Sequence, residues 1–354
     1  MHLFVLRWVV IALLTLIIAI ALVPAWQRKL NQHNLIADQY QYGDLYNNTN
    51  AVRFKEVDFK DNDQLKSDDR PSTKQAGVHL YTIGDSFTDI DTSFYAAEKN
   101  NHVWVGMNQP HVIRLDTSKR NVLVIQVIER VLQERFNGGA WQMYTNRSYV
   151  DSTYRAPIAK TPNHVEKLLG KRFGSDLNSR LEFLFFNNKV ALRVKEAKAS
   201  VLLNWFGRVS GARLSADKKS AFYNEEADST MVLSSFRHLK NSEIDTAVHY
   251  LNRVTQYYQA MGFSEIYLSL IPNKSTVLDP TLGPYNNQIE RIESHPALRP
   301  TLISLIDTIR RHPEWYHLGD GHWNASGRRY WMGQINALVR ASPAELALLR
   351  RKPH

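Results

Sequence analysis

One serine in the sequence stands where a nucleophile would be placed. Ser86 follows Gly84 and Asp85 after VHLYTI, a short apolar run of the kind that forms a buried strand. A serine on a sharp turn at the end of a strand exposes its Oγ, and its backbone N–H can point at a developing oxyanion. The same tripeptide also fits a simple turn in which the serine caps a helix. Its place after the apolar run favours the nucleophile.

A second polar motif, DGHWN at residues 320–324, precedes the last helical segment. A serine nucleophile needs a base, and the base needs a carboxylate that fixes its tautomer. Asp320 and His322 are two residues apart, so on an extended loop their side chains point the same way. The alternative is a loop histidine beside a capping aspartate. With Ser86, the motif predicts a catalytic triad of Ser86, His322 and Asp320.

Polar residues also follow two further apolar runs. Glu129 and Arg130 end the run NVLVIQVI, and Asn273 and Lys274 come just after EIYLSLI. The carboxyl ends of parallel strands meet at one edge of a sheet, so these side chains are expected near the serine. Arg130 or Asn273 could donate to an oxyanion or, with Lys274, bind substrate, and Glu129 could orient Arg130. The alternatives are a surface ion pair and a strand-ending turn.

These motifs need strands and helices to position them. Runs of apolar and β-branched residues predict strands at residues 78–83, 103–107, 121–128 and 265–271, with a further alternating strand at 51–59. Helices are expected at residues 93–99, 129–136, 181–186, 189–209, 242–262 and 301–311, and after Asn324. Asn241 or Ser242 could cap the helix that ends at Gly262. Strands that alternate with helices favour an α/β fold with a mainly parallel sheet.

The N-terminal segment is apolar enough to enter a membrane. From Trp8 to Trp26 the chain has 19 residues without a charge, about the length of a spanning helix. Arg7 precedes the run, and basic residues follow it at 28 and 29, so its orientation stays open. We expect an uncleaved anchor, with a cleaved signal peptide as the alternative. Either one places the rest of the chain across the membrane, facing the periplasm or the cell exterior.

Composition excludes several classes of function. The net charge is +10, but residues 1–29 and 340–354 each contribute three of those charges. The body therefore lacks a basic stripe, and no nucleic-acid partner is expected. The chain has no cysteine, which excludes disulfide scaffolds, thiolate zinc sites, iron–sulfur clusters and a cysteine nucleophile. No cofactor and no metal ion are expected.

The 354 residues divide unevenly by these patterns. We expect a membrane anchor or signal segment, a polar stalk, one catalytic domain with a long insertion, and a basic tail. Their predicted ranges are 1–29, 30–76, 77–340 with the insertion at about 136–240, and 341–354.

The motifs together resemble the SGNH (GDSL) hydrolase superfamily. Residues 84–86 are similar to its first block, and Asp320 with His322 to its last. The Asp-x-His-Trp-Asn form, and PNKSTV at 272–277, resemble the polysaccharide O-acetyltransferase branch of the AlgX/AlgJ type. The resemblance spans residues 77–135 and 240–335.

The resemblance has two departures. The Asp-x-His motif follows the serine, as in most SGNH proteins, whereas in the acetyltransferase branch it precedes it. The superfamily's Gly-x-Asn-Asp block is missing, and the matching strand ends in Glu129 and Arg130. The second oxyanion donor therefore stays open between Arg130 and Asn273, with Gly106 as the counterpart of the block glycine.

The resemblance implies a three-layer α/β sandwich and a reaction. Ser86 would attack an acyl ester and pass the acyl group, an acetyl, to a hydroxyl of a cell-surface or exported polysaccharide. A polytopic membrane acyltransferase would be the partner that supplies acetyl across the membrane. One alternative is an esterase that passes the acyl group to water. Another is a non-catalytic glycan-binding or assembly protein on the same scaffold.

Overall fold

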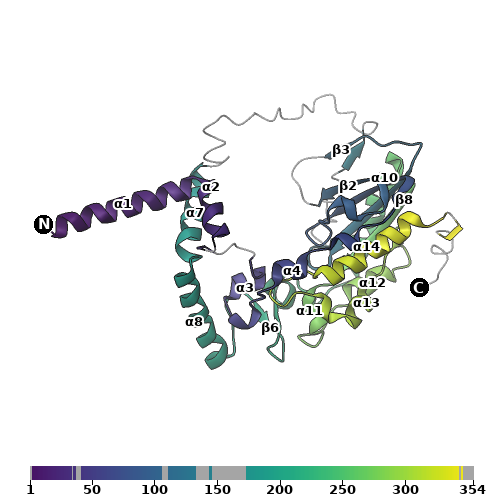
Figure 1. Cartoon of the computed structure of the whole chain (residues 1–354). Coiled ribbons are helices and arrows are strands. Elements are labelled where there is room, and N and C mark those ends of the chain that lie inside the picture. Colours follow the sequence, from purple (N-terminus) through teal and green to yellow (C-terminus); the bar gives the residue numbers. More distant parts are fainter. Residues whose placement is uncertain are drawn as a thin grey trace. The chain divides into compact units, whose positions relative to one another are not determined.

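The computed structural model describes residues 2–33, 35–36, 41–105, 111–132, 143–145, 173–342 and 344–345. The chain forms two compact units, drawn in Figure 1, and each is described by itself. Unit 1 comprises Met1–Val57 and Asp151–Ser210, and unit 2 comprises Asp58–Val150 and Gly211–His354. The predicted Gly106, the second half of the helix at 129–136, the first part of the insertion and most of the basic tail lie outside the described residues.

Unit 2 is built on a five-stranded sheet with the order β2-β1-β4-β8-β9, and every pairing in it is parallel. Its strands are β1 (Gln75–Gly84), β2 (Ala97–Trp104), β4 (Arg120–Ile128), β8 (Glu265–Ile271) and β9 (Thr301–Leu302). The register aligns Ile83 with Ile125 and Ile128 with Ile271, so the three central strands end at the same edge. The predicted α/β class and mainly parallel sheet are confirmed.

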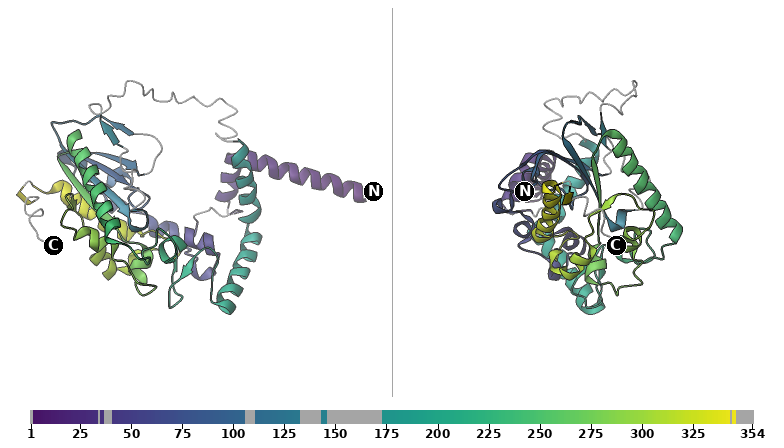
Figure 2. Two further views of the ribbon diagram at one scale, coloured as in Figure 1. Left: turned by 180° about the vertical axis from the view of Figure 1, so that it is seen from behind. Right: turned by 90° about the vertical axis from the view of Figure 1, so that its right-hand side faces the viewer.

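The central strands are apolar on both faces because both faces are covered. Leu123, Ile125 and Val127 of β4 belong to a core cluster that includes α10 and α12, whereas Val122 and Val124 belong to a second cluster with α13 and α14. Figure 2 shows these helices beside the sheet. Such two-sided burial is why β1, β4 and β8 read as near-continuous apolar runs rather than as alternating patterns.

The helices of unit 2 follow their sequence signals closely. They are α4 (Phe59–Asp63), α9 (Asn224–Ala227), α10 (Asn241–Met261), α11 (Lys274–Leu278), α12 (Gln288–Glu293), α13 (Ile306–Arg311) and α14 (Ala325–Arg340). The predicted stop of α10 is confirmed, since Gly262 has φ 105°, a conformation that favours glycine. Lys240, rather than Asn241 or Ser242, is the N-cap of α10. The side chain of Asn324 caps α14 by accepting from the N–H groups of Ser326 and Gly327.

Three local predictions are wrong. Residues 93–99 are not a helix, because a 3-10 turn at Thr92–Phe94 leads into the edge strand β2. That strand exposes much of its polar sequence AEKNNHVW, so it lacks the apolar run of a central strand. Residues 51–59 form a 3-10 turn and the start of α4 rather than a strand. The expected helix at 301–311 begins with β9, and only its second half is helical.

Short strands complete unit 2 outside the main sheet. β3 (His111–Ile113) pairs with β5 (Met143–Thr145), and β6 (Arg213–Leu214) pairs with β7 (Ala221–Phe222) in an antiparallel hairpin.

Unit 1 is helical in its described part. It contains α1 (His2–Leu22), α2 (Pro24–Gln32), α3 (Asp44–Thr49), α7 (Phe173–Phe186) and α8 (Lys189–Phe206). Asn188 caps α8 with its side chain, and Gly207 ends it in the left-handed conformation. The carboxylate of Glu196 on α8 accepts from the Tyr46 hydroxyl and from Lys55 Nζ, both at 2.7 Å, which ties α8 to α3 and to the segment after it.

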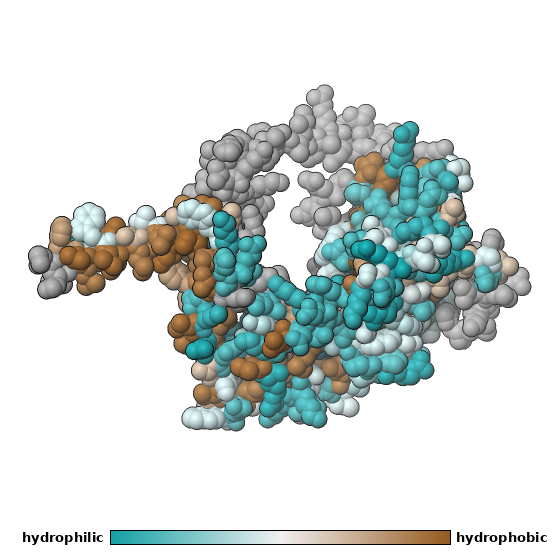
Figure 3. All heavy atoms as spheres, viewed as in Figure 1, coloured by the Kyte–Doolittle hydropathy of each residue, from teal (hydrophilic) through white to brown (hydrophobic). Residues whose placement is uncertain are grey.

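Helix α1 carries most of the apolar segment predicted at 8–26, and residues 24–26 of that segment begin α2. Phe4–Leu22 is the one helix among the described residues that is long and apolar enough to cross a membrane. Its side chains are apolar around the whole circumference and largely exposed, as the brown helix in Figure 3 shows. Such a helix can serve as a membrane anchor or as a signal sequence.

Candidate active site

The turn after β1 displays Ser86. The Asp85 N–H donates to Gln126 Oε1 of β4 (3.0 Å), and Asp85 Oδ1 accepts from the Phe87 N–H (3.0 Å), so Asp85 fixes the turn on both sides of the serine. A Cβ at Gly84 would lie 2.1 Å from Thr88 Oγ1 and 2.6 Å from Gln126 Oε1. Glycine is therefore required for this close approach. The chain continues as a turn after Ser86, not as a helix.

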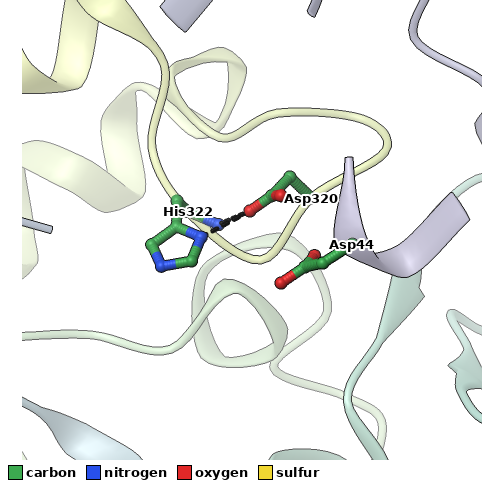
Figure 4. Close-up of side chains that lie close together, drawn as sticks. All are labelled: Asp44, Asp320 and His322. Carbon is green, nitrogen blue, oxygen red and sulfur yellow. Dashed lines mark hydrogen bonds and ion pairs between the residues drawn. The ribbon is translucent and has the colours of Figure 1, made fainter. Parts of the chain in front are cut away.

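The loop before α14 brings Asp320 and His322 together (Figure 4). Asp320 Oδ1 lies 2.5 Å from His322 Nδ1 and also accepts the backbone N–H of His322 at 2.9 Å. The carboxylate is almost fully buried, whereas the imidazole is partly exposed. Asp320 thus holds both the ring and the backbone of His322. Figure 4 also draws Asp44, a residue of unit 1.

Ser86 and His322 are in contact although 236 positions separate them. Ser86 Oγ lies 2.6 Å from His322 Nε2. Trp323 supports the pair, because its indole N–H donates to the Phe87 carbonyl at 2.8 Å and its ring packs edge-on against Phe87. The Phe87 ring also lies 4.7 Å from the imidazole. The structure brings together all three residues of the predicted triad.

This arrangement can move a proton. With Nδ1–H held by Asp320, Nε2 carries the lone pair that accepts the proton of Ser86. Ser86 Oγ would then be an activated nucleophile at a half-buried position. Among the residues that the structure describes, the Ser86 backbone N–H donates no hydrogen bond, so it is available to an oxyanion.

A second group of polar residues lies at the same sheet edge but inside the protein. We call Glu129, Arg130, Glu226, Asn273 and Lys274 the buried polar cluster. Asn273 donates its backbone N–H to Glu129 Oε2 (3.0 Å) and its side-chain amide to Ser235 Oγ (2.8 Å), and its Oδ1 accepts the Arg130 N–H (3.2 Å). Protein groups already occupy the amide that was expected to reach an oxyanion.

Lys274 holds the loop that carries Asp320 and His322 from inside the protein. Its side chain is completely buried, and Nζ donates to the carbonyls of Leu318 and Asp320, both at 3.0 Å. The ammonium group therefore fixes the backbone of the residue that orients His322. This geometry favours a positioning role for Lys274 over the predicted substrate contact.

Arg130 also points into the protein. Its guanidinium lies 3.3 Å from Glu226 Oε2 and 4.9 Å from the ring centre of Tyr223. The Tyr223 ring in turn packs on Gly321, where a Cβ would lie 2.1 Å from Tyr223 Cε2. Arg130 is thus linked through Tyr223 to the loop between Asp320 and His322.

Burial perturbs both acids of the cluster. It raises the pKa of Glu129 to about 7, although hydrogen bonds from Asn273 and Thr276 favour the carboxylate. Burial also raises the pKa of Glu226, against the opposing charges of Arg130 and Lys274. These two carboxyl groups have little access to water, so they cannot readily exchange protons with solvent. We therefore assign the cluster a structural role.

Sequence reasoning missed Glu226, Tyr223 and Gln126. Glu226 and Tyr223 fall in FYNEEAD, a part of the predicted insertion for which neither a helix nor a strand is expected, and no local pattern shows that α9 inserts Glu226 under the site. Gln126 could have been found, because it is a lone polar residue inside the apolar run of β4. A polar side chain in a strand buried on both faces needs a hydrogen-bond partner, here the turn of Ser86.

No protein-family model, no curated protein and no solved structure matches this chain. The candidate site therefore depends on its own geometry.

Proposed function

We propose that this chain is a serine-dependent O-acyltransferase with an SGNH-like three-layer α/β sandwich, facing the periplasm or the cell exterior. One observation carries the proposal. Ser86 Oγ, His322 and the Asp320 carboxylate form a continuous hydrogen-bonded chain, with contacts of 2.6 Å and 2.5 Å. This is the arrangement that activates a serine for attack on an acyl ester.

The proposed reaction has two half-reactions. In the first, Ser86 Oγ attacks the ester carbonyl while His322 Nε2 takes its proton, and Asp320 stabilises the imidazolium. Collapse of the tetrahedral intermediate expels the alcohol, which takes the proton from His322 and leaves an acyl-Ser86. In the second, His322 removes the proton of an acceptor hydroxyl, which attacks the acyl group and regenerates Ser86. The Ser86 N–H donates to the oxyanion in both.

The acceptor separates a transferase from an esterase, because the same triad serves a sugar hydroxyl or water. The proposed acceptor is a cell-surface or exported polysaccharide, and the proposed acyl group is acetyl. Two features support this choice. The motif resembles the polysaccharide O-acetyltransferase branch, and α1 can hold the enzyme at a membrane. There a polytopic acyltransferase would supply acetyl from the other side.

The test uses an activated acetyl ester as donor and an oligosaccharide panel as acceptor. Detergent-solubilised full-length protein should form an acetyl-Ser86 adduct, visible by intact mass, and should yield acetylated oligosaccharide. Ser86→Ala should lose both signals. The matched control is Ser118→Ala, an exposed loop serine of the same unit, which should keep both.

The other outcomes are informative. Acetyl release to water with every acceptor would replace the transferase by an esterase. An absent acetyl-enzyme, together with cellular polymer acetylation that Ser86→Ala leaves unchanged, would show a non-catalytic scaffold.

A further inference from the structure

Helix α8 of unit 1 exposes a strip of apolar side chains. Val190, Val194, Val201 and Trp205 recur at spacings of four and seven residues, so they lie on one face of the helix. Their exposed fractions are 73%, 65%, 42% and 79%. The opposite face packs inward through Ala199 and Leu203, which are less than 9% exposed. Four large apolar side chains in one row exceed the scattered apolar residues of an ordinary surface.

Basic residues border this strip. Arg193 and Lys198 are exposed on its two sides, and Lys189 is exposed at the start of the helix. The one acid of α8, Glu196, turns inward and bonds Lys55 and Tyr46, although the charge of Arg193 also acts on it. An amphipathic helix with an apolar row, basic borders and a tryptophan at one end is typical of a helix in the interface of an anionic membrane.

The same unit contains the helix that can enter a membrane. Helix α1 packs against α7, and α7 passes into α8 after two residues, Asn187 and Asn188. Within this unit α8 runs across the direction of α1 rather than along it, as Figures 1 and 2 show. If α1 crosses a bilayer, a helix in this direction follows the bilayer surface.

We infer that α8 is a membrane-surface helix. The Val190–Trp205 strip lies in the headgroup region of the bilayer that α1 enters, and Arg193 and Lys198 contact anionic lipid headgroups. The inference rests on the membrane insertion of α1 in the proposed function, but not on the chemistry of the triad. It adds a second membrane attachment to unit 1, and this attachment depends on lipid charge whereas that of α1 does not.

The absence of cysteine makes a direct test simple. Val194→Cys places one label on the strip, and Ser200→Cys places a matched label on an exposed polar position of the same helix. Leu14→Cys reports insertion of α1. Each full-length variant, carrying an environment-sensitive fluorophore, is reconstituted into phosphatidylcholine vesicles with about one quarter phosphatidylglycerol. Quenching by lipids spin-labelled near the headgroup is then measured for the labels at 194 and 200, and quenching by lipids spin-labelled deep in the acyl chain is measured for the label at 14.

We expect the label at 194 to be quenched about threefold or more over the label at 200. The Arg193→Gln/Lys198→Gln double variant, or vesicles of phosphatidylcholine alone, should reduce this difference. Equal quenching at 194 and 200 while the label at 14 is quenched would overturn the surface helix and leave the α1 anchor standing. A label at 194 shielded from both lipid quencher and aqueous iodide would show that a protein, such as a second copy, covers the strip, and would also overturn it. Loss of quenching at 14 would refute the insertion of α1 and the inference with it.

Discussion

Two polar groups at the same edge of the sheet differ in what they can reach. The triad has a partly exposed histidine and serine, and its one buried member, Asp320, faces the histidine. In the buried polar cluster the side chains of Glu226, Asn273 and Lys274 are fully enclosed and bonded to protein atoms. Position at a strand end therefore does not by itself make a residue catalytic. The accessible group can do chemistry, and the enclosed one holds the accessible group in place.

We expect the largest loss of activity from removal of the proposed base, His322. His322→Gln should lower kcat for an activated acetyl ester about 10⁴-fold, because Ser86 loses its proton acceptor. The melting temperature should hardly change, since the imidazole is partly exposed. His312→Gln, at an exposed histidine that stacks on Trp315, is the control. Activity within tenfold of that of the unmodified protein would remove His322 from the proposed mechanism.

Removal of the buried ammonium group of Lys274 should lower stability as well as activity. Lys274→Met leaves the carbonyls of Leu318 and Asp320 without their donor. It also removes a positive charge that opposes Glu226. Together these losses should lower the free energy of unfolding by about 3–5 kcal/mol. The kcat should fall with little change in KM, because Asp320 is displaced but substrate contacts are not. Lys219→Met, at a surface lysine, is the control. A large rise in KM at unchanged stability would instead place Lys274 at the substrate.

The pH dependence of stability should reveal Glu129. Its pKa is raised to about 7 in the folded chain from a usual 4.5, so folding takes up a proton between these values. This contribution is fully present below about pH 4.5 and is lost as the pH rises toward 7, by about 3 kcal/mol in total. Glu129→Gln should abolish that part of the decline in urea unfolding measured from pH 5 to 8. An unchanged pH profile would mean that Glu129 is ionised when buried.

The smallest effect on kcat is expected at Trp323, which joins the turn of Ser86 to the loop of His322. Trp323→Phe keeps a ring beside Phe87 but removes part of a fully buried side chain and leaves the Phe87 carbonyl without its indole donor, which should cost about 2 kcal/mol. The kcat should fall a few-fold, because Phe87 links the serine turn to the histidine loop. Trp315→Phe, whose indole stacks on His312, should change neither stability nor kcat to this extent. Equal losses in both variants would assign the effect to general packing.

The elements that could be predicted from the sequence are those whose side chains are apolar because both faces are buried, or whose ends carry capping residues. β1, β4 and β8 lie inside the sheet and read as apolar runs, and α10 and α14 carry caps at their ends. Only the last two residues of the edge strand β2 fall within the strand predicted at 103–107, because exposure keeps the other side chains of β2 polar. The two residues of β9 are too few to show any period.

The residues of the candidate site also differ in whether the sequence alone could identify them. Ser86, Asp320 and His322 could be selected because their chemistry needs particular residue types beside strand ends. The roles of Asn273 and Lys274 could not, because the sequence places them at the sheet edge without saying which way they face. Glu226 reaches the site from the segment between β7 and α10, and only the folded chain brings it under Arg130.

The 236 positions between Ser86 and His322 also bear on when the proposed triad can assemble. Strands β1 and β4 can pair early, but the histidine loop and α14 belong to the last part of the unit to be synthesised. Asn336 of α14 then bonds the backbone of Phe94 and Ala96 beside β2, which closes the N-terminal half of the sheet against the C-terminal helix. Contacts of such long sequence separation form late in folding. A chain still emerging from a ribosome or a translocon would thus carry an inert serine, and reactivity would begin only when the whole unit has closed.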